Sequence, residues 1–164
     1  MLTREESETV LNMFIRKVVR DAKRKSPRAS GALKRSLKGK VKVNPNSMEA
    51  TIQAEDYLPY IDQGVKGILS SAKAPDSPFS FKDKRPPARV LTTWAKRKSG
   101  TFLGRGRKGA GYALSNHIFR YGIRATKFFT KAVDNAFKSL PDELVEAYGL
   151  DIETFVDLTI NKKR

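Results

Sequence analysis

Apolar residues recur at helical intervals through the first part of the chain. Thr3 and Glu6 have the spacing of a capping box, and the apolar positions that follow are Val10, Leu11, Phe14, Val18 and Ala22. Pro27 ends the run. The pattern predicts a helix over residues 3–25, with acids in its first turns and basic residues near its end, an order that the helix dipole favours.

A different pattern, in which apolar and polar residues alternate, follows this helix. "KVKV" at 40–43 and "MEATIQAE" at 48–55 flank "NPNS", where Asn and Pro favour a turn. The sequence therefore predicts an antiparallel hairpin. Between the helix and the hairpin, Leu33 and Leu37 are the apolar anchors of a stretch broken by proline and glycine.

The second half of the chain combines one irregular stretch with further helical patterns. "YLPYIDQG" at 57–64 predicts a short helical turn with Tyr57, Tyr60 and Ile61 on one face. Residues 65–88, rich in proline and serine, predict an exposed excursion. Helices are predicted over 88–98 (with Val90, Leu91 and Trp94 inward), 112–122, 128–140, a short stretch from Pro141, and 151–160.

These elements predict an α+β fold, with a long N-terminal helix and several C-terminal helices packed on a small antiparallel β-sheet. A chain of 164 residues is expected to form a single domain, here over residues 1–164. Within it we expect an irregular insertion over 65–88 and a basic glycine-rich loop over 99–111.

Positive charge dominates the composition and is unevenly distributed. The chain has 33 Lys and Arg against 17 Asp and Glu, a net charge of +16. Residues 84–133 hold thirteen of the basic residues and no acid, whereas the stretch from Asp134 onward has seven acids and four basic residues. Such a segregation indicates an anionic partner or an oppositely charged neighbouring copy. The candidate contact residues for DNA or a neighbouring subunit are Lys96, Arg97, Lys98, Arg105, Arg107 and Lys108.

The glycine-rich loop contains Gly104, Gly106 and Gly109 at the spacing G-x-G-x-x-G, which is typical of dinucleotide sites. That chemistry needs a preceding buried strand and an acid about 20 residues further on. A helical pattern with a basic end precedes this loop, and the first carboxylate after it is Asp134. The loop is therefore interpreted as a basic connection and not as a nucleotide site.

Few residues of the chain suit catalysis or metal binding. There is no Cys, and His117 is the single His. We expect no enzyme activity, no cofactor and no metal site. No run of 18 apolar residues occurs, and the acidic N-terminus is unlike a signal peptide, so we expect a soluble protein without membrane contact.

Three stretches together resemble the tail-completion or neck proteins of tailed bacteriophages. The first follows the long helix: Pro27, Ser30-Gly31, Leu33 and Ser36-Leu37 match the family's proline, its Thr-Gly or similar pair, and "L-x-x-S-I". The second, "YLPYIDQG", is similar to "Y-A-x-Y-V-E-x-G", and the third, "FFTKAVDNAF", to "F-L-x-x-A". The matched positions are Gly31, Leu33, Leu37, Tyr57, Tyr60, Asp62, Gly64, Phe128, Phe129 and Ala132.

The resemblance covers about residues 10–64 and 122–138. Asp62 replaces the usual Glu, Val65 follows Gly64 where Thr is common, and the span 65–121 is longer than in compact members. The resemblance implies a non-enzymatic virion protein that forms a homo-oligomeric ring at the head–tail joint. It also implies portal, connector and tail proteins as partners, with duplex DNA passing through the lumen.

Charge alone supports an alternative, a sequence-nonspecific nucleic-acid-binding protein of the architectural or ribosome-associated kind. Both interpretations need positive contacts to phosphates that do not depend on the base sequence.

Changing Arg105, Arg107 and Lys108 together to Ala is expected to impair particle assembly or DNA retention, because the loop loses its cations. The monomer should stay folded. Complementation of assembly and circular dichroism of the purified variant measure the two effects. Normal assembly with normal DNA retention would remove the loop from the interface.

Overall fold

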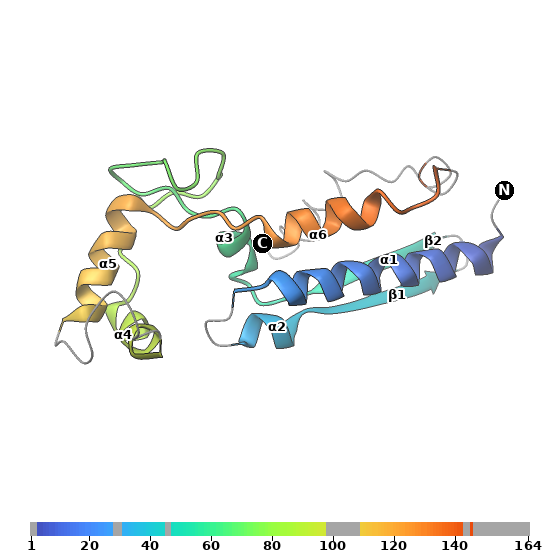
Figure 1. The fold of residues 1–164 in the computed structure, drawn as a ribbon, viewed down its shortest axis with the longest axis horizontal. Coiled ribbons are helices and arrows are strands. Elements are labelled where there is room, and N and C mark those ends of the chain that lie inside the picture. The colour runs from blue at the N-terminus through green and yellow to red at the C-terminus, as the bar shows by residue number, and fades with distance from the viewer. Residues whose placement is uncertain (1–2, 28–30, 45–46, 98–108, 143–144, 146–164) are drawn as a thin grey trace. The chain divides into compact units, whose positions relative to one another are not determined.

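The computed structural model describes residues 3–27, 31–44, 47–97, 109–142 and 145, with the backbone alone for 93–97. Helices and one small antiparallel sheet make an α+β fold, as predicted (Figure 1). Contacts divide the chain into two compact units. Unit 1 comprises Met1–Leu58 and Lys127–Arg164, and unit 2 comprises Pro59–Thr126. The expected single domain stays a prediction.

The first helix, α1, spans Arg4–Lys25 and confirms the helix predicted over 3–25. Its capping box is formed: the Glu6 amide donates to Thr3 Oγ1 over 3.3 Å, and the Thr3 amide donates to Glu6 Oε2 over 2.7 Å. Two hydrogen bonds with Thr3 lower the pKa of the Glu6 carboxyl. The one from the Thr3 backbone has the larger effect, and the one with the Thr3 side chain has the smaller. The capping box therefore fixes where the helix begins.

The predicted hairpin is confirmed by β1 (Lys38–Asn44) and β2 (Ser47–Gln53), which pair antiparallel. The register places Gly39 opposite Ile52 and Val41 opposite Ala50 on the face toward α1. Successive side chains alternate between faces, so the opposite face carries polar residues. On β1 these are Lys38, Lys40 and Lys42, all exposed.

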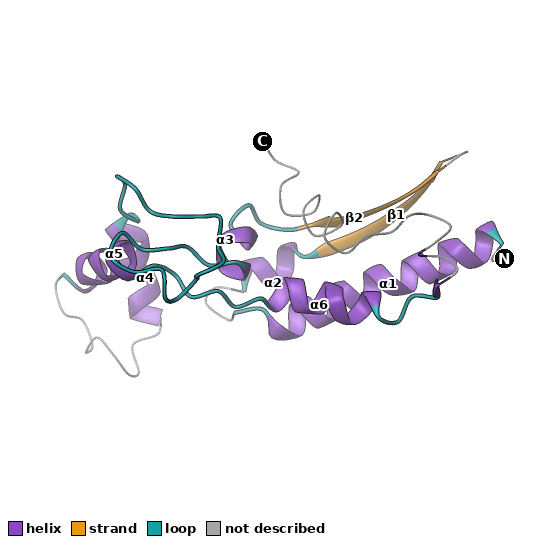
Figure 2. Ribbon diagram, turned by 90° about the horizontal axis from the view of Figure 1, so that it is seen from above, coloured by secondary structure: helices purple, strands orange, loops and turns teal. Residues whose placement is uncertain are grey.

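Helix α1 packs against both strands of the hairpin and against α6 (Phe128–Phe137). The hairpin forms one layer of unit 1, and α1 with α6 forms the other (Figure 2). Phe129 is fully buried, and the rings of Phe14 and Phe137 meet edge to face with centroids 5.6 Å apart. The helix predicted over 128–140 is confirmed over Phe128–Phe137, and its buried side chains include Phe128, Ala132, Val133 and Ala136.

A short helix, α2 (Ala32–Ser36), lies where only two apolar anchors were predicted. Leu33 is 3% exposed and Leu37 is fully buried, so both anchors are in the core. Gly31 precedes the helix with φ +71°, a backbone conformation that other L-residues adopt at a cost. Five residues are too few for apolar periodicity to identify a helix.

In unit 2, α4 (Ala88–Arg97) packs against α5 (Ala110–Tyr121). A Cβ on Gly111 would lie 1.9 Å from Thr92 Oγ1, so glycine permits the close approach of the two helices. The buried positions of α5 are Gly111 and Ser115. Inward burial of Val90 was predicted and is wrong: its side chain is 62% exposed, because α5 meets α4 at the positions of Ala88 and Thr92.

The segment from Val65 to Pro87 contains isolated bridges but no helix or strand. Val65 and Ile123 exchange backbone hydrogen bonds of 3.0 and 2.8 Å, and Phe81 donates to the Lys66 carbonyl over 3.0 Å. The predicted exposure is wrong for Val65, Ala74 and Ser77, which are buried. Backbone pairing between distant segments satisfies the polar groups that burial would otherwise leave without partners.

A second short helix, α3 (Leu58–Asp62), matches the turn predicted over 57–64. Gly64 follows it with φ +75°, and a Cβ there would lie 2.6 Å from the Ala125 amide nitrogen and the Ile123 carbonyl oxygen. The predicted helix over 151–160 lies outside the described residues, as does most of the one predicted from Pro141.

Phe129→Ala is expected to lower the free energy of unfolding by about 3–5 kcal/mol, because it leaves a cavity among side chains with no access to solvent. Urea denaturation followed by circular dichroism measures the change. Met13→Ala is the control, since Met13 is 66% exposed and its loss should cost about 0.5 kcal/mol or less. Equal effects of the two variants would contradict the packing of α6 on α1.

Gly64→Ala is expected to destabilise unit 2 by about 2–5 kcal/mol, through a left-handed backbone and overlap with backbone atoms. Gly109→Ala is the matched control: its φ is +95°, but nothing lies within 4 Å of the added Cβ. It should therefore cost about 1–2 kcal/mol. Amide hydrogen exchange at Val65 and Ile123 reports on unit 2 directly, and similar exchange in both variants would refute the close approach at Gly64.

Candidate functional site

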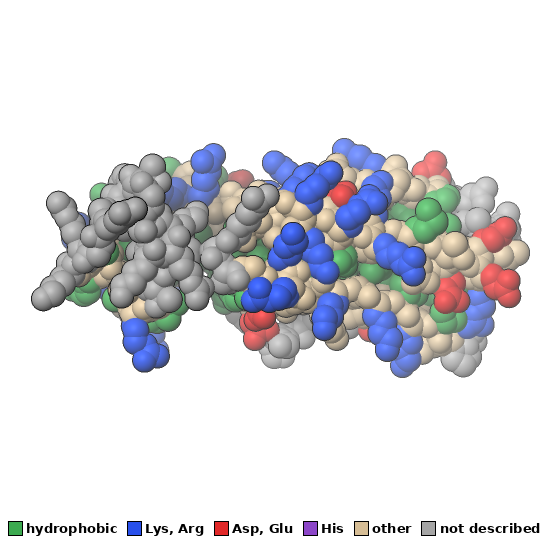
Figure 3. Space-filling view, turned by 60° about the horizontal axis from the view of Figure 1, so that its bottom comes forward, with side chains coloured by type: hydrophobic (Ala, Val, Ile, Leu, Met, Phe, Trp, Pro, Cys, Tyr) green, Lys and Arg blue, Asp and Glu red, His purple; other side chains and the backbone are tan. Residues whose placement is uncertain are grey.

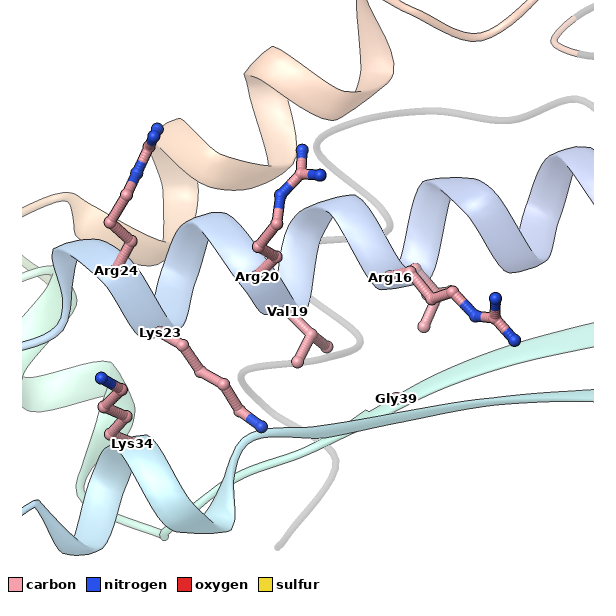
Figure 4. A pocket seen from close by; sticks show the side chains of 8 residues that line it. Arg16, Val19, Arg20, Lys23, Arg24, Lys34 and Gly39 are labelled. Atoms are coloured by element: carbon pink, nitrogen blue, oxygen red, sulfur yellow. The ribbon is translucent and has the colours of Figure 1, made fainter.

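A groove with a basic lining lies within unit 1, between α1, α2 and β1 (Figure 4). Its volume is about 540 Å³. The residues that line it are Ile15, Arg16, Val19, Arg20, Lys23, Arg24, Lys34 and Gly39. Five of these eight residues are cationic and none is acidic, so the groove is a candidate site for anions.

Helix α1 supplies two neighbouring rows of the lining. Arg16, Arg20 and Arg24 follow one another at intervals of four residues and therefore lie on one face of the helix. The adjacent row, at the same interval, is Ile15, Val19 and Lys23. One row is thus entirely cationic, and the other passes from apolar to cationic along the helix.

Gly39 brings β1 against the apolar part of α1. A Cβ on Gly39 would lie 2.2 Å from Ile15 Cγ2 and 3.1 Å from Val19 Cγ2. Real Cβ atoms do not approach so closely, and glycine therefore sets the distance between the strand and the helix. The contact between Gly39, Ile15 and Val19 thus belongs to the lining of the groove, and Lys23 points from α1 toward β1 (Figure 4).

Lys34 reaches the groove from α2. The two leucines of this helix, Leu33 and Leu37, are buried and fix its position. The Leu37 amide donates to the Leu33 carbonyl over 3.2 Å and closes the last turn. Three residues of the family-like motif, Gly31, Leu33 and Leu37, thus hold the helix that presents Lys34.

Asp21 is the acid nearest to the cationic row. Its Oδ1 lies 3.4 Å from Arg20 Nε and 3.8 Å from Arg24 NH2, and the arginine side chains are 72% and 73% exposed. Such exposed pairs contribute about 0–1 kcal/mol each. Within the described ranges, no acid other than Asp21 forms an ion pair with a cation of the groove. Arg16, Lys23 and Lys34 therefore leave the groove with an excess of positive charge.

The surface around the groove is also basic. Lys and Arg side chains cover much of the face on which α1, α2 and β1 lie, and acidic side chains gather near the start of α1 (Figure 3). Asp21 apart, the acids of α1 are confined to its first two turns, at Glu5, Glu6 and Glu8.

The basic residues singled out from the sequence belong to a different part of the chain. Lys96 and Arg97 form the end of α4 in unit 2, where the backbone alone is described. Lys98, Arg105, Arg107 and Lys108 lie outside the described residues. Their role as contacts for DNA or a neighbouring subunit stays a prediction.

Arg85, one of the cations in the stretch 84–133 that contains no acid, makes contacts within unit 2. Arg85 donates to Asn116 Oδ1 over 2.8 Å and to the Tyr112 hydroxyl over 3.2 Å, and its guanidinium lies 5.6 Å from the centre of the Phe119 ring. These partners lie along one face of α5. Arg85 thus fastens the segment before α4 to α5, and its charge has a structural use.

The remaining motif residues divide between core and surface. Phe128, Phe129 and Ala132 are buried in unit 1. Tyr57 and Tyr60 are 37% and 45% exposed, and the Tyr60 ring lies 4.6 Å from that of Phe79.

Asp62, the fourth residue of the tyrosine motif, has no exposed surface. Its carbonyl accepts from the Thr126 amide over 3.1 Å, and Thr126 Oγ1 donates to the Ile61 carbonyl over 2.8 Å. These bonds join the end of α3 to the segment that leads out of unit 2.

The groove was not predicted from the sequence. The basic residues at the end of α1 were attributed to the helix dipole, although the interval of four residues between Arg16, Arg20 and Arg24 was a visible signal. The contributions of Lys34 and Gly39 depend on tertiary packing and had no signal in the sequence.

In the part of the chain that the structure describes, no three His, Cys, Asp or Glu side chains come together as metal ligands would. Over the same residues, no helix has the length and apolar character that crossing a bilayer requires.

No protein-family model, no curated protein and no solved structure matches this chain.

Proposed function

We propose that the protein is a structural, non-enzymatic component of a tailed-phage virion, which forms a ring around the DNA channel at the head–tail joint. The proposal rests on the order of the neck-like motifs, and the observation that carries it furthest is the groove of five cations. A ring through which a genome slides needs positive contacts that ignore the base sequence. The neck-like motifs contribute core residues that hold the cation-bearing helices in position.

Residues of the neck-like motifs pack against the two helices that carry the cations of the groove. Gly31, Leu33 and Leu37 fix α2 and with it Lys34, while Phe129 and Ala132 pack on the helix that carries the arginine row. The residues that resemble the family are thus the scaffold of the basic surface. Under this proposal, one chain provides both the neck-like motifs and the basic surface.

Exposed apolar side chains support association between copies. Large hydrophobic residues on the surface of a monomer often mark an interface. Of the eight that are exposed among the described side chains, six belong to unit 2: Tyr60, Ile68, Leu69, Val90, Tyr112 and Tyr121. Ion pairs between exposed groups are weak, so apolar burial at unit 2 would supply the stability of the ring.

The proposed place at the head–tail joint determines which partners the ring would contact. Portal or connector proteins would contact one side of the ring and tail proteins the other, and duplex DNA would occupy the lumen. The protein would assemble in the host cytoplasm and reside in the virion.

Purified protein is expected to form closed rings visible by electron microscopy, and antibody labelling should place it at the head–tail joint of particles. Leu69→Asp should reduce the ring fraction at least several-fold, because a charge would enter the interface. Met13→Asp is the matched control, since Leu69 is 64% and Met13 66% exposed. Sedimentation analysis quantifies both.

A protein that stays monomeric, binds duplex DNA and is absent from particles would overturn the ring. That result would favour the alternative of a sequence-nonspecific nucleic-acid-binding protein. Hydrolysis of DNA in the presence of magnesium would instead contradict the structural, non-enzymatic role.

A further inference from the structure

We propose that the groove between α1, α2 and β1 binds the phosphate backbone of duplex DNA, with Arg16, Lys23 and Lys34 as direct contacts. This inference rests on the proposed function in taking DNA as the polyanion. The proposed place of contact differs from the one predicted from the sequence. The prediction concerned the loop over 99–111, whereas the groove lies in unit 1.

The length of the cationic row fits an extended polyanion. Residues four apart on an α-helix are separated by about 6 Å along its axis, so Arg16 and Arg24 are about 12 Å apart along α1. Over that length duplex DNA carries about seven phosphate charges. Lys23 and Lys34 add cations beside the row. A single small anion would leave most of these charges without a counterion.

The lining also favours phosphates over an acidic peptide. Guanidinium groups bind phosphate through two parallel hydrogen bonds, and lysine adds point charges. Peptides are recognised through apolar pockets, through pairing with the backbone or, for acidic and phosphorylated motifs, through arginine clusters. The regular row of cations along α1 fits the regular spacing of phosphates in a duplex better than the carboxylates of a peptide. The apolar lining here is limited to Ile15, Val19 and Gly39, and Ile15 is only 3% exposed.

Duplex is favoured over single-stranded nucleic acid. Binding of single strands relies on aromatic side chains on which bases stack. Among the residues that the structure describes, no aromatic side chain lines the groove. The cations of the groove come from two helices, α1 and α2, and are not the side chains of a single recognition helix that reads base edges in the major groove. The contacts are therefore to the backbone and independent of base sequence.

The test compares two triple variants of the full chain. Arg16→Gln, Lys23→Gln and Lys34→Gln remove three cations from the groove and leave the partners of Asp21 in place. Lys38→Gln, Lys40→Gln and Lys42→Gln remove three exposed cations from the opposite face of the hairpin. The two variants have equal net charge. Thermal unfolding by circular dichroism checks that both are folded.

Fluorescence anisotropy with a short labelled duplex, at several salt concentrations between about 50 and 200 mM, gives affinity and salt dependence. The groove variant is expected to bind roughly tenfold more weakly or worse. The slope of log K against log salt should fall in magnitude by about 2.7, because each phosphate contact contributes about 0.9. The hairpin variant should change the slope by less than about one contact.

A second measurement does not depend on the variants. Bound duplex should protect Lys23 and Lys34 of the unmodified protein from acetylation, read by mass spectrometry, while Lys40 and Lys42 stay reactive. Equal protection of all four lysines would overturn the groove as the site.

Three further results would also overturn the inference: equal loss of binding in both variants, displacement of the duplex by polyglutamate at the same charge concentration, or equal affinity for a single-stranded oligonucleotide. None of them bears on ring formation, which electron microscopy tests separately. Conversely, a monomeric protein whose groove variant loses duplex binding would support the groove and contradict the ring.

Discussion

The packing of α1 against both the hairpin and α6 is the constraint on which unit 1 depends. Leu11, Phe14 and Val18 are buried along this helix, and the fully buried Phe129 comes from α6. Apolar burial of this kind fixes the rotation of a helix about its own axis. Once that rotation is fixed, the positions of Arg16, Arg20 and Arg24 are fixed as well. The basic groove is therefore a consequence of the core, and Gly39 completes it by admitting β1 close to the helix.

Local patterns were sufficient to predict much of the fold and little of the site. The capping box and apolar spacing identified α1, and alternation identified the hairpin, because both signals are contained in a few neighbouring residues. Val90 was misplaced because Gly111 allows α5 to approach α4 at another position. The groove needs three separate elements to meet. Lys34 belongs to a helix too short to show a period, so no sequence pattern linked it to α1.

A run of like charges in a sequence gives the number of charges but not their positions in the folded protein. Residues 84–133 contain thirteen cations and no acid, yet Arg85 is engaged by Asn116, Tyr112 and the Phe119 ring within unit 2. The cations that share a groove come instead from α1, which also contains acids, and from α2. Separation of charge on the folded surface is thus a better guide to an anionic partner than separation along the chain.

The order of charges along α1 has an electrical consequence. Glu5 and Glu6 lie in the first turn, and Lys23, Arg24 and Lys25 in the last, so one end of a 22-residue helix is negative and the other positive. The charged side chains thereby form an electric dipole along the helix, opposite in direction to that of the peptide groups. A polyanion at a distance attracts the positive end and repels the negative one, which exerts a torque on the unit. The molecule would begin to rotate into a productive orientation before any atom touches its partner.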